Sequence, residues 1–337
     1  MNDRNLPADN LYAVASVLPD RPFNSTSPKI LIVAEHASAV FGGEALIPFQ
    51  YFKVLREIGV DVHLLVHERT RNELEASFPQ ETERLHFVKD SFINVWCHKI
   101  GQMLPSRLAA FTLGALSHFD TQLRQRRAAK TLILAHRFDI VHEPIPVSPK
   151  LPSMTFGLAV PVVIGPMNGG MDYPPSYNLA GPVERFLVFF LRHSSAIWNY
   201  ILPGKRRAAV LLVANERTRN ALPSGVKGKP ILTLPENGVD LKLFKPAQTK
   251  EPDERLRIIC VCRLVDWKRV DLLLDACSNL IGKMRFQLDL VGDGPLRKSL
   301  EDQVKRLRLE QHVRFHGRIA HTQMIDLLQA ADIMVLP

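Results

Sequence analysis

Two basic side chains in the segment VCRLVDWKRVD, residues 261–271, have a spacing that suits phosphate binding. Arg263 follows an apolar run that predicts a strand, and Lys268 lies five residues later, near the expected start of a helix. The N-terminus of a helix carries partial positive charge and free backbone N–H groups, so two cations beside it could bind a diphosphate. The alternative is that both residues form ordinary surface salt bridges.

Glycines follow the next two predicted strands of the same region. Gly292 and Gly294 stand in LVGDGPLRKSL, and Gly317 stands in HGRIAHTQM. Residue 297 is arginine, so the first of these segments lacks the G-x-G-x-x-G fingerprint of nicotinamide cofactors. No Asp-x-Asp pair occurs in the chain, which argues against a carboxylate-held metal on a donor diphosphate. We therefore expect a site that uses neither a metal nor a cofactor.

The first half of the chain offers a second group of candidate residues. Pro144 ends the apolar run FDIV, which leaves His142 and Glu143 at the lip of a predicted strand. A His–Glu pair there could transfer protons or form hydrogen bonds with sugar hydroxyls, although a lone histidine at a strand end is often structural. Gly42 and Gly43 precede a predicted helix, and adjacent glycines would let backbone N–H groups approach a phosphate. A plain tight turn is the alternative for these glycines.

The elements that must position these residues alternate between apolar strands and helices. Near-continuous apolar runs such as KILIVAEH, residues 29–36, are typical of strands buried on both faces of a parallel sheet. Six such strands precede residue 231, and four more follow residue 257. The pattern predicts an α/β protein with two Rossmann-like parallel sheets. Ligands of such sheets bind at the carboxyl ends of the strands, where the candidate residues fall.

The length of 337 residues suggests two domains. Residues 1–28 are polar and contain several prolines, so we expect a loose leader. The first domain is predicted over residues 29–230 and the second over residues 231–337, with a linker-like stretch, KPAQTKEPDERLR, at its entrance.

The pentapeptide ERTRN occurs twice, at residues 68–72 and 216–220, each time after an apolar strand. Thr70 and Glu73 have the spacing of a capping box, in which the two side chains satisfy free backbone N–H groups at a helix start. Shared helix-start chemistry explains the repeat better than a domain duplication does.

A net charge of +9 and a pI near 9.5 favour anionic partners. The chain has no helix-turn-helix, zinc-finger or RNP-like motif, so we expect no nucleic-acid partner. It has neither an apolar run long enough to span a membrane nor an N-terminal signal region, which predicts a cytoplasmic location. The segment Val183–Leu202, followed by GKRR, could rest on an anionic membrane face, or it could be a core-facing helix.

Taken in order, several motifs resemble those of glycosyltransferase family 4, whose members are retaining, metal-independent enzymes of the GT-B fold. In the second half these are ENGVD, VCRLVDWKRVDLLLDA, VGDGPLR and VRFHGRIAHTQMIDLLQAADIMVLP. In the first half FGGEALIPFQYFKVLREIGVDVHLLVHERT, VHEPIPVSP and VVIGPMNGGMDYP are similar to the exopolysaccharide and lipid-linked-sugar branch. The resemblance implies two Rossmann-like domains that face a cleft.

The resemblance also implies a reaction and roles for residues. A hexose would move, with retention, from a nucleotide-diphosphate sugar to a hydroxyl of a glycan or lipid-linked acceptor, in exopolysaccharide or cell-surface glycan synthesis. Arg263 and Lys268 would bind the donor diphosphate, and the turn at Gly42 and Gly43 would close over it. His142, with Glu143 beside it, would face the transferred sugar. The nucleotide would be held by a group of loop residues: Gly292, Gly294, Gly317, Arg318 and Ile319.

In this family the strand VLP is followed by a serine-containing loop and a Glu-x7-Glu motif, whereas the chain ends at Pro337. We therefore expect a second domain that is incomplete after its fourth strand. Two alternatives to an active glycosyltransferase stay open. The chain could be an inactive truncated product or a binding-only remnant of such an enzyme. Less favoured is an epimerase of nucleotide sugars, or a phosphorylase, with the same fold.

Overall fold

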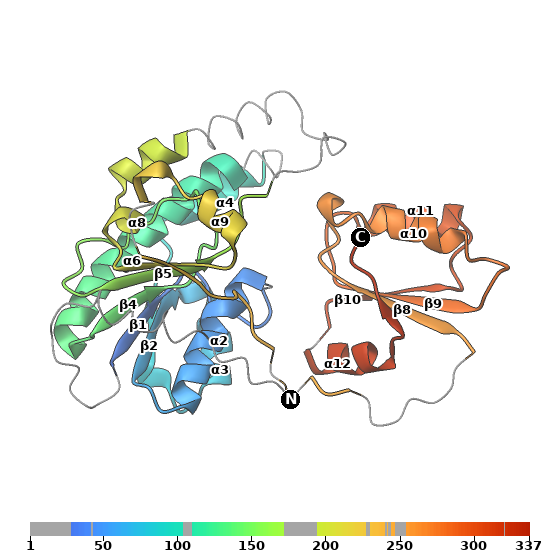
Figure 1. Ribbon diagram of the computed structural model, residues 1–337, viewed down its shortest axis with the longest axis horizontal. Helices are drawn as coiled ribbons and strands as arrows, with labels where there is room; N and C mark the ends of the chain where they lie inside the picture. Colours follow the sequence, from blue (N-terminus) through green and yellow to red (C-terminus); the bar gives the residue numbers. More distant parts are fainter. Residues whose placement is uncertain are drawn as a thin grey trace. The chain divides into compact units, whose positions relative to one another are not determined.

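The computed structural model describes residues 28–41, 43–103, 110–171, 194–226, 230–239, 241, 244–246, 254–319 and 321–337. The chain divides into two compact units, Met1–Asn237 and Gly238–Pro337, which are considered one at a time (Figure 1). Of the leader expected over residues 1–28, all but the last residue lie outside the described residues.

The first unit is built on a parallel sheet with the strand order β3-β2-β1-β4-β5-β6-β7. Its strands are β1 (Ile30–Val33), β2 (Val62–His67), β3 (Leu85–Val88), β4 (Ile140–Glu143), β5 (Val162–Met167), β6 (Val210–Val213) and β7 (Ile231–Thr233). The central strand β1 pairs with β2 on one side and with β4 on the other. Because β7 pairs with β6 in this sheet, the division between the units falls later than the expected boundary at residue 231.

Helices cover both faces of this sheet (Figure 1). They are α2 (Gly43–Glu57), α3 (Arg71–Ser77), α4 (Phe92–Gly101), α6 (Ala115–His136), α8 (Gly204–Arg207) and α9 (Glu216–Asn220). Side chains of β1 alternate between two cores: Leu31 packs with Ile133 of α6, and Ile32 packs with Phe52 of α2. Since both faces of β1 are covered, its sequence is apolar throughout, as the near-continuous run predicts.

The predicted capping box at Thr70 and Glu73 is not formed. A short 3-10 turn, η1 (Glu68–Thr70), precedes α3, and Thr70 has φ −101° and ψ 4°, outside the extended region that a capping residue adopts. Its hydroxyl donates instead to the carbonyl of His67 at 3.1 Å. Glu73 accepts hydrogen bonds from the Ser38 hydroxyl at 2.6 Å and the Ala39 amide at 2.7 Å. Glu73 therefore anchors the loop between β1 and α2.

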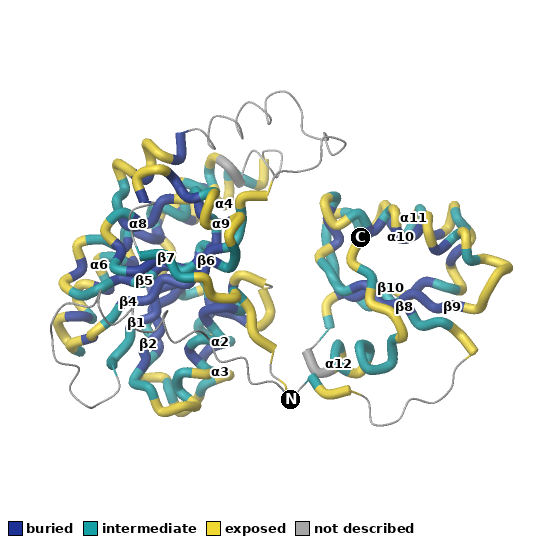
Figure 2. The backbone as a smooth tube through the Cα atoms, viewed as in Figure 1, coloured by how far each residue is buried: buried dark blue, intermediate teal, exposed yellow. Residues whose placement is uncertain are grey.

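The second unit has a parallel sheet with the order β10-β9-β8-β11. The strands are β8 (Leu256–Val261), β9 (Phe286–Val291), β10 (Val313–Gly317) and β11 (Ile333–Met334). The helices α10 (Val270–Ser278) and α11 (Arg297–Arg306) cover one face, and α12 (His321–Ala330) lies on the other (Figure 1). The central strands of both sheets are buried along most of their length (Figure 2).

The α/β class with Rossmann-like parallel sheets is confirmed. The expected neighbourhood of the fourth and first strands of the second sheet is found as well, because β11 pairs with β8 through Ile333 and Ile258. That the two units face a cleft stays a prediction. No helix among the described residues combines the length and the apolar content needed to cross a membrane.

Three histidines gather at the amino-terminal edge of the first sheet. His63 Nδ1 lies 2.9 Å from His86 Nε2, and the ring of His136 is centred 5.0 Å from that of His63. Burial, followed by the charge of the neighbouring histidine, lowers the pKa of both His63 and His86 to about 4. Both rings are therefore neutral at pH 7.

This cluster predicts a loss of stability in mild acid. As the pH falls from about 6.5 to about 4, His63 and His86 become protonated in the unfolded chain but stay neutral in the folded chain. We expect the free energy of unfolding to fall by on the order of 2 kcal/mol over this window. Urea unfolding at a series of pH values would measure it. His86→Gln should flatten the dependence, whereas the exposed control His98→Gln should not, and an equal slope in both variants would refute the assignment.

Candidate active site

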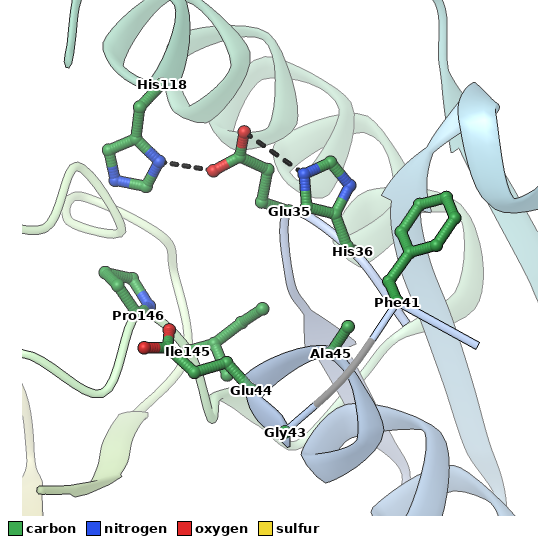
Figure 3. Close-up of a pocket in the computed structure, with 9 residues that line it drawn as sticks. All are labelled: Glu35, His36, Phe41, Gly43, Glu44, Ala45, His118, Ile145 and Pro146. Carbon is green, nitrogen blue, oxygen red and sulfur yellow. Dashed lines mark hydrogen bonds and ion pairs between the residues drawn. The ribbon is translucent and has the colours of Figure 1, made fainter. Parts of the chain in front are cut away.

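A cavity of about 270 Å³ lies in the first unit, beyond the carboxyl ends of β1 and β4. Its walls come from the loop after β1, the start of α2, the helix α6 and the loop after β4 (Figure 3). The lining residues are Glu35, His36, Phe41, Gly43, Glu44, Ala45, His118, Ile145 and Pro146. This is the edge of the sheet at which open α/β folds bind their ligands.

Glu35 is held between two histidines (Figure 3). Its carboxylate lies 2.5 Å from His118 Nδ1 and 3.5 Å from His36 Nε2. Burial of the carboxyl opposes ionisation, but the hydrogen bonds from His118 and His36 outweigh it and keep the pKa of Glu35 far below its usual range. Glu35 is thus an ionised carboxylate at neutral pH, and each ring must donate to it.

Polar side chains on one face of α6 point at the strand ends. His118, Gln122 and Gln125 follow the i, i+4, i+7 spacing that aligns residues on a helix. Gln125 donates to the carbonyl of Ala34 at 2.6 Å, and Gln122 donates to Glu143 at 3.2 Å. These contacts fix α6 against β1 and β4, and they place His118 beside Glu35.

His142 and Glu143 are the last two residues of β4, as predicted, but both side chains are buried. His142 is 8% exposed, its Nε2 donates to the carbonyl of Gly165 at 2.7 Å, and its ring meets Tyr51 edge-on at 4.8 Å. Burial lowers the pKa of His142 to about 4, although the Gly165 carbonyl partly offsets this. Neither His142 nor Glu143 lines the cavity of Figure 3, and their catalytic role stays a prediction.

Glu143 is the centre of a buried polar cluster. Its carboxyl accepts hydrogen bonds from Gln122, from Ser153 at 2.5 Å and from Thr155. Burial raises the pKa of Glu143, although these hydroxyl donors and the charge of Lys205 work against the rise. Because Ser153 and Thr155 belong to the loop after β4, Glu143 holds that loop, and with it one wall of the cavity.

Lys205 secures the same loop from the other side. Its ammonium donates to the carbonyls of Ser148 at 2.8 Å and Pro149 at 2.9 Å, and the residue is 1% exposed. Burial lowers the pKa of Lys205 to about 7, and the charge of Glu143 moderates the fall. Lys205 belongs to the basic run GKRR, for which membrane contact was one of two alternatives, and the structure buries its side chain.

The predicted glycine turn at the start of α2 is described only in part. Gly42 lies outside the described residues, and Gly43 is the first residue of α2. Gly43 is exposed, and a Cβ added there would meet nothing within 4 Å. Packing therefore does not require glycine at this position, and the space in front of its backbone belongs to the cavity.

In the second unit the predicted nucleotide loops come together at the carboxyl edge of the sheet. Gly292 has φ +125°, and a Cβ there would stand 2.0 Å from the carbonyl oxygen of Cys262. A Cβ on Gly294 would stand 2.3 Å from the carbonyl oxygen of Leu264. The amide of Gly292 also donates to Gly317 at 2.8 Å. These glycines let the loops after β8, β9 and β10 touch through their backbones.

Arg318 and Ile319 directly follow Gly317 at the end of β10. Arg318 is exposed, and Ile319 is half-buried. Their predicted contact with a nucleotide base, like that of the three glycines, stays a prediction.

The two predicted diphosphate ligands, Arg263 and Lys268, are exposed. Arg263 lies in the loop after β8, and Lys268 ends the 3-10 turn η5 (Asp266–Lys268) just before α10. Within the part of the chain that the structure describes, neither has a carboxylate within 4 Å, unlike Arg269, which pairs with Asp271 at 2.9 Å. The described residues thus do not support the surface salt-bridge alternative for Arg263 and Lys268.

Sequence reasoning missed Glu35, His36 and His118. Glu35 and His36 follow β1 directly, so the rule that ligands bind at the carboxyl ends of strands could have found them. His118 gave a weaker signal, a polar position aligned with Gln122 and Gln125 on a long helix. Its partner Glu35 is 83 residues away in the sequence, which no local pattern reveals.

These parallel sheets, with polar and glycine-rich loops at their carboxyl edges, define a Rossmann-like α/β fold. In agreement, residues 242–337 match the family of glycosyl transferases group 1. The second unit therefore contains a domain of that group. Figure 1 shows the strands β8 to β11 of this region.

Two curated relatives extend the similarity. The putative colanic acid biosynthesis glycosyltransferase WcaL of Escherichia coli K12 is 31% identical over 101 residues, which is 30% of this chain and 25% of WcaL. A GDP-mannose-dependent monoacylated alpha-(1-6)-phosphatidylinositol monomannoside mannosyltransferase of Corynebacterium glutamicum is 29% identical over 166 residues, 43% of this chain and 42% of the relative. The aligned parts thus span less than half of these relatives.

Solved structures show the same fold over a larger part of the chain. The crystal structure of Anabaena HepE in complex with UDP-glucose is similar over 91% of this chain and 73% of HepE, with a TM-score of 0.54. The sequence identity is 15%, so the likeness concerns the fold alone.

Proposed function

We propose that the protein is a glycosyltransferase that moves a hexose from a nucleotide-diphosphate sugar to a hydroxyl of a glycan or lipid-linked acceptor. The observation that carries the proposal is the pair of exposed cations Arg263 and Lys268 beside the start of α10, which have no carboxylate partner in the described part of the chain. The similarity of residues 242–337 to glycosyl transferases group 1 supports it. So do a structural relative crystallised with UDP-glucose and relatives named for colanic acid and phosphatidylinositol mannoside glycosyl transfer.

In this proposal Arg263 and Lys268 act on the leaving group. The bond between the anomeric carbon and the donor phosphate oxygen breaks, and both electrons stay with the diphosphate. Fixed cations at that position stabilise the growing negative charge in the transition state more than in the bound donor. The backbones at Gly292, Gly294 and Gly317 hold the nucleotide next to them.

Retention follows if the acceptor approaches on the face that the diphosphate leaves. The acceptor oxygen then bonds to the anomeric carbon, and its proton passes to an oxygen of the departing diphosphate. The protein contributes mainly by positioning the two substrates. Glu143 and His142, buried behind the cavity, would support its wall.

Nucleotide binding tests this function directly. Titration calorimetry with UDP, GDP and ADP in the presence of EDTA should show binding of at least one of them, and incubation with the matching nucleotide sugars should transfer the sugar. Binding without transfer to any acceptor would favour the binding-only alternative. Transfer with inversion would refute the retaining mechanism, and lack of binding by all three nucleotides would overturn the proposal.

We also propose a cytoplasmic protein with peripheral contact to an anionic membrane. Of the segment expected to make this contact, residues 183–193 lie outside the described residues, and residues 194–201 form a helix. This helix exposes four apolar or aromatic side chains: Ile197, Trp198, Tyr200 and Ile201. Arg206 stacks on Tyr200 at 4.7 Å and Arg207 is exposed, which places positive charge next to the apolar face.

Vesicle sedimentation checks the membrane contact. Ile197→Asp with Ile201→Asp should reduce binding to phosphatidylglycerol-containing vesicles about fivefold or more, because two charges would enter the apolar face. The control Leu134→Asp alters an exposed leucine on α6 and should leave binding unchanged. Equal binding to neutral and anionic vesicles would contradict the proposed contact.

A further inference from the structure

The charge of the cavity in the first unit restricts what it can bind. Glu35 and Glu44 place two carboxyl groups on its walls, and among the described residues that line it there is no lysine or arginine. Glu35 is ionised, because its hydrogen bonds to His118 and His36 lower its pKa. A phosphate or carboxylate ligand would meet this negative charge, and the His36 and His118 rings beside it already donate to Glu35.

The cavity is also built to accept hydrogen bonds. An ionised carboxylate is an acceptor with two oxygens, and neighbouring hydroxyls of a sugar are donors that can share them. Glu35 is 25% exposed at its side chain, so a ligand can reach it, while His118 at 2.5 Å fixes its orientation. A rigid acceptor of this kind costs little ordering entropy when a polyol binds.

An aromatic ring completes the lining. Phe41 is 56% exposed, and its ring meets that of His36 edge-on at 6.1 Å (Figure 3). The loop that carries it is fixed, because the buried Ser38 hydroxyl accepts from the amides of Val40 and Phe41 at 3.0 Å each. An exposed aromatic face offers apolar contact to the C–H groups of a sugar ring.

The size of the cavity agrees with a single ring. A volume of about 270 Å³ is below the roughly 300–1,000 Å³ typical of sites for larger ligands. It suits one monosaccharide unit better than a whole nucleotide sugar.

We infer that this cavity is a subsite for an uncharged hexose ring of the acceptor, with Glu35 accepting hydrogen bonds from two of its hydroxyls and Phe41 contacting its apolar face. The inference deepens the proposed function. It rests on that function only in assigning the bound sugar to the acceptor rather than to another ligand. It assigns the terminal acceptor sugar to the neutral hexoses and excludes uronic acids and phosphorylated sugars. It also separates this cavity from the diphosphate, which the turn at Gly42 and Gly43 was expected to contact.

Saturation-transfer NMR with glucose and glucuronate as probes tests the inference on the whole chain. Wild-type protein should bind glucose at least tenfold more tightly than glucuronate. Glu35→Gln keeps the size of the side chain and removes its charge, so it should weaken glucose binding about fivefold or more and reduce the preference to about twofold. The matched control Glu83→Gln removes an exposed carboxylate elsewhere in the first unit and should change neither value.

A second variant, Phe41→Ala, keeps the inference testable if Glu35→Gln does not fold. Glu35→Gln also removes the partner of His118, whereas Phe41→Ala changes an exposed side chain and should leave the fold intact. Phe41→Ala should weaken glucose binding at least threefold without altering the preference over glucuronate. Glucuronate binding as tightly as glucose, or glucose binding that neither variant weakens, would overturn the inference.

The two failures can be told apart. Nucleotide titration of the same samples reports on the second unit, and Glu35→Gln should leave it unchanged. If glucose binds through Glu35 but no nucleotide binds, the sugar subsite stands and the glycosyltransferase proposal falls. If nucleotides bind and transfer proceeds while glucose binding ignores Glu35, only the subsite is wrong.

Discussion

Replacing both Arg263 and Lys268 with alanine is expected to lower kcat/KM for sugar transfer by about 10³-fold. Both side chains are exposed and without a carboxylate partner among the described residues, so the folded protein loses no ion pair when they are removed. Their charges act on a leaving diphosphate, where negative charge increases as the sugar bond breaks. Removal of a single preorganised group of this kind costs about 10²-fold or more in rate.

The controls for this prediction lie in the same unit. Lys283→Ala and Arg285→Ala remove an exposed lysine and an exposed arginine near the opposite edge of the sheet, before β9. They change the net charge equally and should leave kcat/KM within about twofold of wild type. Steady-state kinetics with the donor found by calorimetry would measure the effect. A loss of equal size in the control double variant would mean that general charge, rather than the position of Arg263 and Lys268, governs donor binding.

The strands of both sheets except β7 could be predicted because each is a short apolar run. Gly317 ends β10, and the predicted strand and the observed one cover the same residues, 313–317. Prediction was poorer where an apolar run lacked neighbours on both sides. The run DIMVLP, residues 332–337, was expected to be one strand, yet β11 pairs only through Ile333 and Met334. Pairing with β8 decides its length, and hydrophobicity alone does not.

The sequence predicts the exposure of candidate residues best where it depends on neighbouring residues alone. Arg263 and Lys268 are exposed beside a helix start, as the spacing indicates. The burial of Glu143 could not be predicted, because its partners Ser153 and Thr155 come from a loop that folds back over β4. A polar residue at a strand end faces solvent only if no later segment covers it.

Lys205 shows the same limit more sharply. Within GKRR it is indistinguishable from the arginines that follow it, yet its ammonium is bound by two carbonyls 56 and 57 residues earlier in the chain. Burying a lysine is costly unless such acceptors are in place, and those acceptors are set by tertiary structure. The sequence holds no local sign of them. For the same reason the contact between Glu35 and His118 became visible only in the folded chain.

The glycines of the second unit permit a test that separates two reasons why a position requires glycine: a positive φ, and too little space for a Cβ atom. Gly282 has φ +76° and open space around it, so Gly282→Ala should cost about 1 kcal/mol from backbone strain alone. Gly294 does not have a positive φ but lies against the carbonyl of Leu264, so Gly294→Ala should cost about 2–3 kcal/mol from overpacking. Gly292 combines both conditions, and Gly292→Ala should cost the most, about 3–4 kcal/mol.

Urea unfolding followed by circular dichroism would measure this series, with Gly238→Ala as a control that meets neither condition. The functional consequence is as specific as the energetic one. An alanine at Gly294 pushes on the loop that carries Arg263, since Leu264 is the next residue, so nucleotide affinity should fall together with stability. Gly282→Ala should lower stability slightly and leave affinity unchanged. If Gly294→Ala were as stable as wild type and bound nucleotide equally well, the close packing of the loops after β8 and β9 could not be what positions Arg263.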